Sequence, residues 1–140
     1  MWCATVALNT ISGLSKEQDW EVHMIEHQIG AYTDCAHGAG LAVVSVPYYK
    51  YIALYGTDKF ARFAKTVWEI DTSKMTAVEA AAAGIEKLAE FIKVIGLPTT
   101  LKELGATEDM LPLIANSTVI GGGYKVMQPD DILKVLKECY

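Results

Sequence analysis

A capped helix signal between Thr76 and Pro98 constrains the fold of this chain more than any other stretch. Thr76 and Glu79 have the spacing of a capping box, in which each side chain bonds the backbone N–H group of the other residue. Gly96 and Pro98 then supply a helix stop. Between them, apolar residues recur at helical spacing: Ala81, Ile85, Leu88, Ala89 and Ile92. The pattern predicts a helix over about 76–95 with one apolar face.

The rest of the chain also has the pattern of helices joined by turns. Further helices are expected over 1–12, 20–32 and 38–46, and from Thr57, Thr100, Thr107 and Pro129. Asp19 is expected to cap the second helix and Thr57 the fourth, while Pro47 ends or kinks the third. Gly121 to Gly123 are interpreted as a linker or turn. The prediction is an all-α helical bundle.

Three apolar stripes are expected to form the core, in addition to the face of the capped helix. They are Val22, Ile25 and Ile29; Phe60, Phe63, Ala64, Val67 and Trp68; and Ile132, Val135, Leu136 and Cys139. The first segment starts without a cap and enters core-like residues at once, as a chain that begins in the middle of a domain would.

Length and composition bound the possible functions. A chain of 140 residues is long enough for one domain and one modest core, so a single domain is expected. Hydrophobic residues make up 51% of the chain, at the apolar end for a soluble domain. This favours apolar faces that pack on something larger, either in a homo-oligomer or against a missing partner.

Charge and cysteine content exclude other classes. The net charge is −5 and the 12 Lys and Arg residues are dispersed, which argues against nucleic acid and anionic membranes as partners. Cys3, Cys35 and Cys139 are far apart and form no CxxC pair, as expected in a reducing cytoplasm. We find no secretory leader and no apolar run of membrane-spanning length. A cytoplasmic protein is therefore expected.

All three histidines of the chain lie within fifteen positions, at His23, His27 and His37. His23 and His27 are four residues apart, so on a helix they share one face. Two or three imidazoles could thus converge on one metal ion. A His-Glu-x-x-His metalloprotease is excluded, because Glu26 precedes His27 instead of following His23, and its carboxylate is expected to point elsewhere.

Ordinary structural roles for these residues remain open. A helix histidine is more often hydrogen-bonded at a surface or in a core than bound to metal. Gly38 and Gly40 would equally serve close helix packing or a turn. Cys35 is interpreted as a small buried residue, because no base is positioned to make it a nucleophile.

The histidine stretch resembles a known family. The matching residues are Asp19-Trp20, His23-x-x-x-His27, Ala31-Tyr32 and His37-Gly38-x-Gly40-Leu41-Ala42, with further likeness at Met1-Trp2-x-Ala4-Thr5, Leu8-Asn9, Val67-Trp68-x-Ile70, Ile95-Gly96-Leu97-Pro98-x-Thr100-Leu101 and Pro129-x-Asp131-Ile132-Leu133. They are similar to the C-terminal helical region of iron-containing (group III) alcohol dehydrogenases, especially the NADPH-dependent butanol dehydrogenase branch. The likeness covers nearly all of the chain.

The resemblance implies the C-terminal part of the dehydroquinate synthase-like, iron-containing alcohol dehydrogenase fold, and therefore a single partial helical metal-binding domain over 1–140. In that family an Asp and three His hold a divalent metal, Fe²⁺ or Zn²⁺, which polarises the substrate oxygen. The carry-over makes His23 and His37 metal ligands. It makes His27 a non-ligand histidine beside the metal and the nicotinamide of NADP(H), with a catalytic and cofactor-binding role. The implied reaction interconverts small aldehydes and primary alcohols.

The chain also departs from the family pattern. The Asp-x-x-x-His pair that supplies the other two ligands, and the Gly-rich nucleotide-binding domain, should precede the residues seen here. We therefore expect a fragment that is inactive alone and that associates with a missing N-terminal part or with itself. The alternative is a helical structural or interaction module, or a split-enzyme subunit, that associates through exposed apolar faces.

Overall fold

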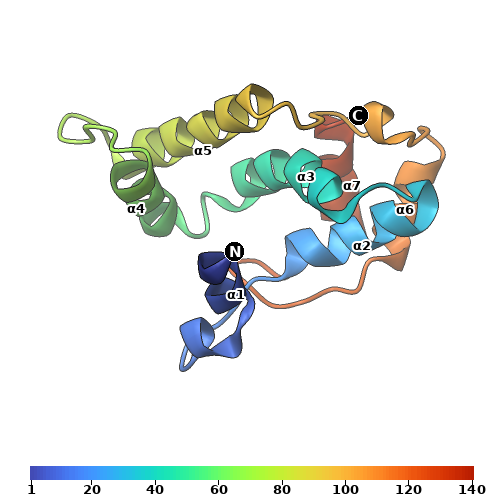
Figure 1. Cartoon of the computed structure of the whole chain (residues 1–140), viewed down its shortest axis with the longest axis horizontal. Helices are drawn as coiled ribbons and strands as arrows, with labels where there is room; N and C mark the ends of the chain where they lie inside the picture. The colour runs from blue at the N-terminus through green and yellow to red at the C-terminus, as the bar shows by residue number, and fades with distance from the viewer.

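The computed structural model describes the backbone of residues 1–140 and every side chain except that of Thr10. It confirms the all-α prediction, with helices in each part of the chain (Figure 1). In chain order the elements are α1 (Trp2–Leu8), the short 3-10 helix η1 (Thr10–Gly13), α2 (Glu21–Thr33), α3 (His37–Ile52), α4 (Thr57–Val67), α5 (Ala77–Val94), the 3-10 helix η2 (Lys102–Leu104), α6 (Met110–Ser117) and α7 (Pro129–Glu138).

Helix α3 lies at the centre of the arrangement. It packs against α2, α5 and α7, while α6 packs against both α2 and α7. Helix α4 packs on α5 at the far end of the molecule from the α2–α3 turn (Figure 1). The predicted apolar faces of α2 and α7 are confirmed: Val22, Ile25, Ile29, Ile132, Val135, Leu136 and Cys139 are all buried in one core.

The capped helix is confirmed as α5. The Thr76 hydroxyl accepts the N–H of Glu79 at 3.2 Å, and the Glu79 carboxylate accepts the N–H of Thr76 at 2.7 Å. Gly96 follows the helix with a φ of 76°, a left-handed conformation that suits glycine at a helix end. Local capping chemistry is enough to set both ends of this helix.

Two predicted helix boundaries are wrong, and a third is displaced by one residue. Helix α3 continues through Pro47 to Ile52, because proline removes one backbone hydrogen bond but keeps a helical φ, and Val44 and Tyr48 on either side of it are buried. The hydroxyl of Thr57 does not cap α4; it donates to the carbonyl of Ala53 at 2.9 Å. Asp19 lies one position before the N-cap of α2, although its carboxylate still accepts the N–H of Glu21 at 3.0 Å.

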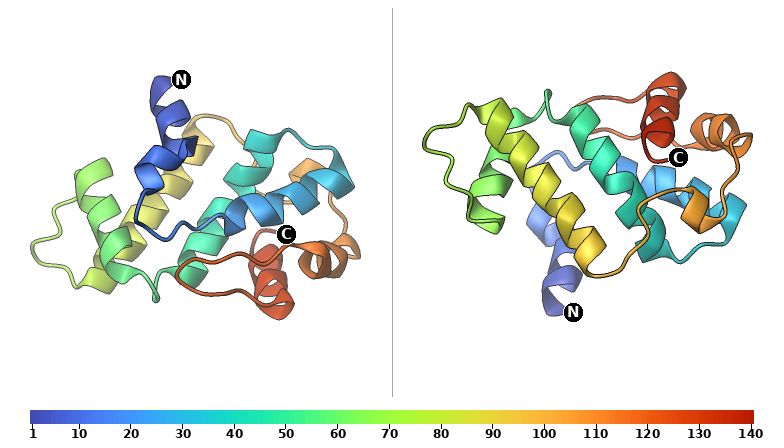
Figure 2. Two further views of the ribbon diagram at one scale, coloured as in Figure 1. Left: turned by 90° about the horizontal axis from the view of Figure 1, so that it is seen from below. Right: turned by 90° about the horizontal axis from the view of Figure 1, so that it is seen from above.

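The first segment consists of core-like residue types, yet it is exposed. None of the residues of α1 is buried, and Trp2 keeps 77% of its surface exposed. Both views in Figure 2 show this helix projecting from the body of the molecule. The stripe expected on α4 is only partly correct, because Ala64 is buried but Val67 is 57% exposed. These apolar residues lack a packing surface within the described residues.

A polar network fastens the loop between α6 and α7. The Asp131 carboxylate accepts hydrogen bonds from the Tyr51 hydroxyl at 2.5 Å and from the Lys125 ammonium at 2.6 Å. The ammonium also lies 4.7 Å from the centre of the Tyr51 ring. Hydrogen bonds from Lys125 and Tyr51 hold the pKa of Asp131 well below its ordinary value. The loop that carries Gly121 to Gly123 is thereby joined to α3 and α7.

Among the residues that the structure describes, no helix combines the length and the apolar character that a bilayer crossing requires.

Candidate metal centre

The three histidines meet where α2 turns into α3. The ring centres of His23 and His37 are 5.5 Å apart, those of His27 and His37 are 5.7 Å apart, and those of His23 and His27 are 6.4 Å apart. His23 and His27 come from one face of α2, and His37 is the first residue of α3. Asp34 ends α2 in a left-handed conformation with a φ of 54°, and the chain turns there toward α3.

Glu26 is the site residue that the sequence did not reveal. Its side chain is buried, and one carboxylate oxygen contacts Nδ1 of His37. The expectation that this carboxylate points away from the histidines is therefore wrong. Helical spacing predicts only which residues of α2 share a face with Glu26. The contact is instead with His37 of α3, eleven residues later in the chain.

The donor atoms are of the kinds that bind a divalent metal. One ligand atom from each of Glu26, His27 and His37 lies within 4.8 Å of the other two. The His23 ring lies beside this group, at the ring-centre distances given above. Imidazole nitrogen and carboxylate oxygen are common ligands of iron and zinc, so the residues present fit such an ion.

The environment favours neutral imidazole at His23. Burial lowers the pKa of His23, and the positive charges that His37 and His27 carry when protonated lower it further. Trp20 also packs edge-on against this ring, with ring centres 5.1 Å apart. A neutral imidazole retains the lone pair that metal binding requires.

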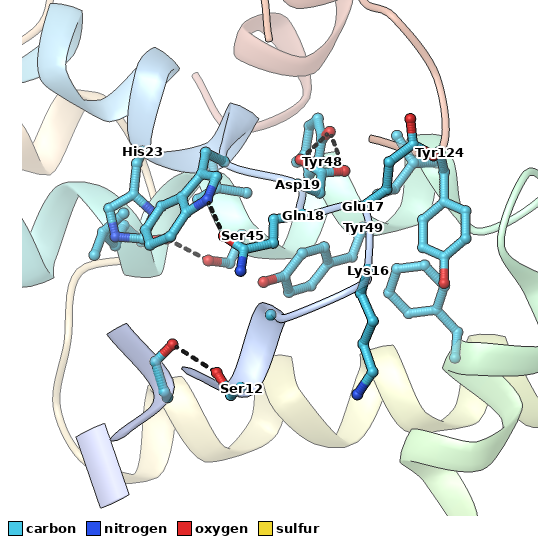
Figure 3. Close-up of a pocket in the computed structure, with 17 residues that line it drawn as sticks. Ser12, Lys16, Glu17, Gln18, Asp19, His23, Ser45, Tyr48, Tyr49 and Tyr124 are labelled. Atoms are coloured by element: carbon cyan, nitrogen blue, oxygen red, sulfur yellow. Dashed lines mark hydrogen bonds between the residues drawn. The ribbon is translucent and has the colours of Figure 1, made fainter. Parts of the chain in front are cut away.

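A cavity of about 550 Å³ opens beside His23. Figure 3 shows residues that line this cavity. Among them, Asp19 and Tyr48 are hydrogen-bonded to each other. The Tyr48 hydroxyl donates to both carboxylate oxygens of Asp19, at 3.0 and 2.9 Å. Burial and the adjacent Asp19 charge raise the pKa of Tyr48 far above its ordinary value. The phenol therefore stays protonated and serves as a fixed donor to Asp19.

A second buried carboxylate supports the start of α2. Glu21 is fully buried, and it accepts the backbone N–H of Gly121 at 2.9 Å. Burial raises the pKa of Glu21. This bond ties the loop after α6 to the helix that carries His23 and His27. Its hydrogen bond is to backbone, so Glu21 supports the fold around the histidines.

An all-helical unit that gathers three imidazoles and a carboxylate between two helices has the features of a metal-binding helical domain. Residues 1–140 match the family described as Fe-containing alcohol dehydrogenase family, C-terminal. The chain belongs to this family, as the C-terminal region of its members.

Two relatives illustrate the range of the match. The chain is 34% identical to NADH-dependent butanol dehydrogenase A of Clostridium acetobutylicum, over 100% of this chain and 37% of the relative. It is 29% identical to the NADPH-dependent aldehyde reductase YqhD of Escherichia coli, over 100% of this chain and 36% of the relative. The chain thus spans little more than a third of the length of these relatives.

The fold agrees with that of a solved relative. The crystal structure of an NADH-dependent butanol dehydrogenase A from Thermotoga maritima superposes with a TM-score of 0.88 at 30% sequence identity. The match covers 99% of this chain and 37% of that protein. The expected correspondence with the C-terminal part of the iron-containing alcohol dehydrogenase fold is confirmed.

Proposed function

We propose that this chain supplies the metal-holding part of an NAD(P)H-dependent alcohol dehydrogenase that interconverts small aldehydes and primary alcohols. The convergence of His23, His27 and His37 at the α2–α3 junction is the observation that carries the proposal. The names of relatives that act on butanol and aldehydes support the substrate class. Both NADH and NADPH occur in those names, so the proposal includes NADP(H) and NAD(H).

In this proposal His23 and His37 hold the ion and His27 does not. His23 is suited to the role because its surroundings favour the neutral ring. A bound Fe²⁺ or Zn²⁺ would supply a Lewis acid for the substrate oxygen. Neither His23 nor His37 needs to exchange a proton with the substrate in this scheme.

His27 has the exposure that a proton-handling group needs. It is the exposed member of the pair on α2, and its ring stacks on that of His37. We assign it the catalytic and cofactor-binding role, in which a ring nitrogen exchanges a proton near the substrate oxygen and the nicotinamide. The rest of the dinucleotide site is assigned to a polypeptide equivalent to the other two thirds of the relatives.

Metal titration tests the ligand assignment. We expect the chain to bind Zn²⁺ or Co²⁺ in calorimetry. His23→Ala and His37→Ala should each weaken the metal affinity by more than about 100-fold. That loss is larger than the roughly 10- to 100-fold loss expected when a residue that only supports a ligand is removed. His27→Ala is the matched comparison and should retain most of the affinity. Loss of binding in His27→Ala together with full binding in His23→Ala would instead indicate ligation by Glu26, His27 and His37.

An activity assay tests whether catalysis requires the polypeptide that carries the remaining ligands. The isolated chain with butanal, Fe²⁺ and NADH or NADPH is expected to show no turnover, because it offers half of the family's ligands. Turnover that His23→Ala abolishes would contradict this. Addition of the N-terminal two thirds of a relative should restore activity if the chain acts as a subunit of a split enzyme.

The exposed first segment favours a second candidate function, association through α1. Trp2, Leu8 and Ile11 are all more than half exposed and lie on the projecting segment. We propose that this segment packs against the polypeptide equivalent to the preceding part of the relatives. Trp2→Lys with Ile11→Lys should prevent that complex in sedimentation velocity. Binding unaffected by the double variant would exclude this segment as the contact.

A further inference from the structure

The Glu26 carboxylate lies in a space that Gly40 leaves between α2 and α3. A Cβ added at Gly40 would lie 2.7 Å from Cγ and 2.8 Å from Oε1 of Glu26. A Cβ at Gly30, on the same helix as Glu26, would lie 3.5 Å from that oxygen, which is an ordinary contact distance. Gly40 is buried and has an ordinary helical backbone, so its missing side chain matters for space. Glycine at this position lets the carboxylate reach the histidines from the buried side.

The partner of this carboxylate is a histidine nitrogen. Glu26 is 2% exposed, and a buried carboxylate requires hydrogen-bond donors. Oε2 accepts from Nδ1 of His37, whose side chain remains 54% exposed. A neutral imidazole has one N–H group, so donation from Nδ1 leaves the lone pair on Nε2. The contact therefore selects which nitrogen of His37 is free to bind an ion.

We propose that Glu26 is a positioning residue of the metal centre, which fixes His37 in the Nδ1–H form and aims Nε2 at the ion. The proposal rests on the proposed function, because it assumes that His37 is a ligand. A carboxylate behind a metal-bound histidine fixes the ring and strengthens it as a ligand. The negative charge of Glu26 would also partly neutralise the positive charge of a divalent ion bound nearby.

Two substitutions separate the hydrogen bond from the charge. Glu26→Met keeps an unbranched side chain of similar length but removes the acceptor. Glu26→Gln keeps an acceptor oxygen and removes the charge. Glu21→Gln is the matched control, because Glu21 is also a buried carboxylate on α2 but bonds the backbone of Gly121. Circular dichroism checks that each variant remains helical.

The first readout is the form of the His37 ring without metal. Long-range ¹H–¹⁵N spectra of the metal-free chain at pH 8 distinguish the two neutral forms of the ring. We expect the Nδ1–H form in the unaltered chain, in Glu26→Gln and in Glu21→Gln. In Glu26→Met the Nε2–H form should predominate. An unchanged His37 ring in folded Glu26→Met would overturn the positioning role.

The second readout is Zn²⁺ affinity in calorimetry. Loss of outer-shell support predicts a 10- to 100-fold weaker affinity for Glu26→Met, a smaller loss for Glu26→Gln, and none for Glu21→Gln. If Glu26→Gln lost binding as completely as His37→Ala, Glu26 would itself be a ligand and the proposal would be overturned. If the unaltered chain bound no metal, the proposed function would fail, whereas the ring readout would still decide the contact between Glu26 and His37.

Discussion

Helices α1 and α2 show that apolar sequence and burial are separate properties. Six of the seven residues of α1, in the sequence WCATVAL, are apolar, yet none is buried. Helix α2 mixes charged, polar and apolar residues, and it buries Val22, Ile25 and Ile29 together with two glutamates. Helix α2 is covered by α3 and α6, whereas α1 projects from the body (Figure 2). Hydrophobic stabilisation requires a second surface that removes the side chain from water.

The largest expected difference between these regions is the response to removal of an isoleucine side chain. Ile29→Ala should lower the free energy of unfolding by about 3 kcal/mol, because Ile29 is completely buried and a cavity would remain. Ile11→Ala should change it by less than about 0.5 kcal/mol, since Ile11 is 66% exposed. Urea unfolding measures both. A cost at Ile11 equal to that at Ile29 would show that the first segment is packed in solution.

The next effect tests whether polar contacts also stabilise the packed region. Asp131→Asn should cost about 2 kcal/mol at pH 7, because it weakens hydrogen bonds to a charged group. The pKa of Asp131 is lowered in the folded chain, so its stabilisation is present above its ordinary value and lost as the pH falls. The difference in the free energy of unfolding between the unaltered chain and Asp131→Asn should therefore become smaller below about pH 4.

Asp130→Asn is the control for this substitution. Asp130 is also in the first turn of α7, but it is exposed. Its replacement should change stability by less than about 0.5 kcal/mol. Denaturant unfolding at pH 7 and pH 3 would compare the two variants. Equal costs at both positions would contradict a specific role for the contacts to Tyr51 and Lys125.

A smaller effect distinguishes the two glycines of the His-Gly-x-Gly motif. Gly40→Ala should cost about 1–2 kcal/mol, because the added Cβ meets the buried side chain of Glu26. Gly38→Ala meets no atom within 4 Å, and it should stabilise the helix by up to about 1 kcal/mol. Thermal unfolding of the two variants should shift in opposite directions. Shifts in the same direction would contradict the close approach of α2 and α3 at Gly40.

The smallest expected effect concerns the helix ends. Thr76→Ala should destabilise the chain by about 1 kcal/mol through loss of the capping box on α5. Helix α1 has no side-chain cap, so Met1→Ala should leave stability unchanged. Chemical denaturation followed by circular dichroism measures both. A Thr76→Ala variant as stable as the unaltered chain would show that tertiary packing alone holds the start of α5.

Helix existence could be predicted because its signals are local. The capping box at Thr76, the periodic faces of α2 and α7, and proline at the start of α7 act within a few residues, and the structure confirms each. Two boundary predictions failed, one in a packed helix and one at a local hydrogen bond. Helix α3 continues through Pro47, and the Thr57 hydroxyl bonds back to Ala53. Packing on several sides stabilises a helix beyond what its local sequence favours.

The sequence alone determined that the chain is helical and that its histidines lie close together along the chain. Tertiary structure alone decided that Glu26 meets His37, because that contact crosses between helices and depends on the space beside Gly40. It also decided that the most apolar helix lies exposed. Helical periodicity records which residues share a face, whereas burial depends on which surface covers that face.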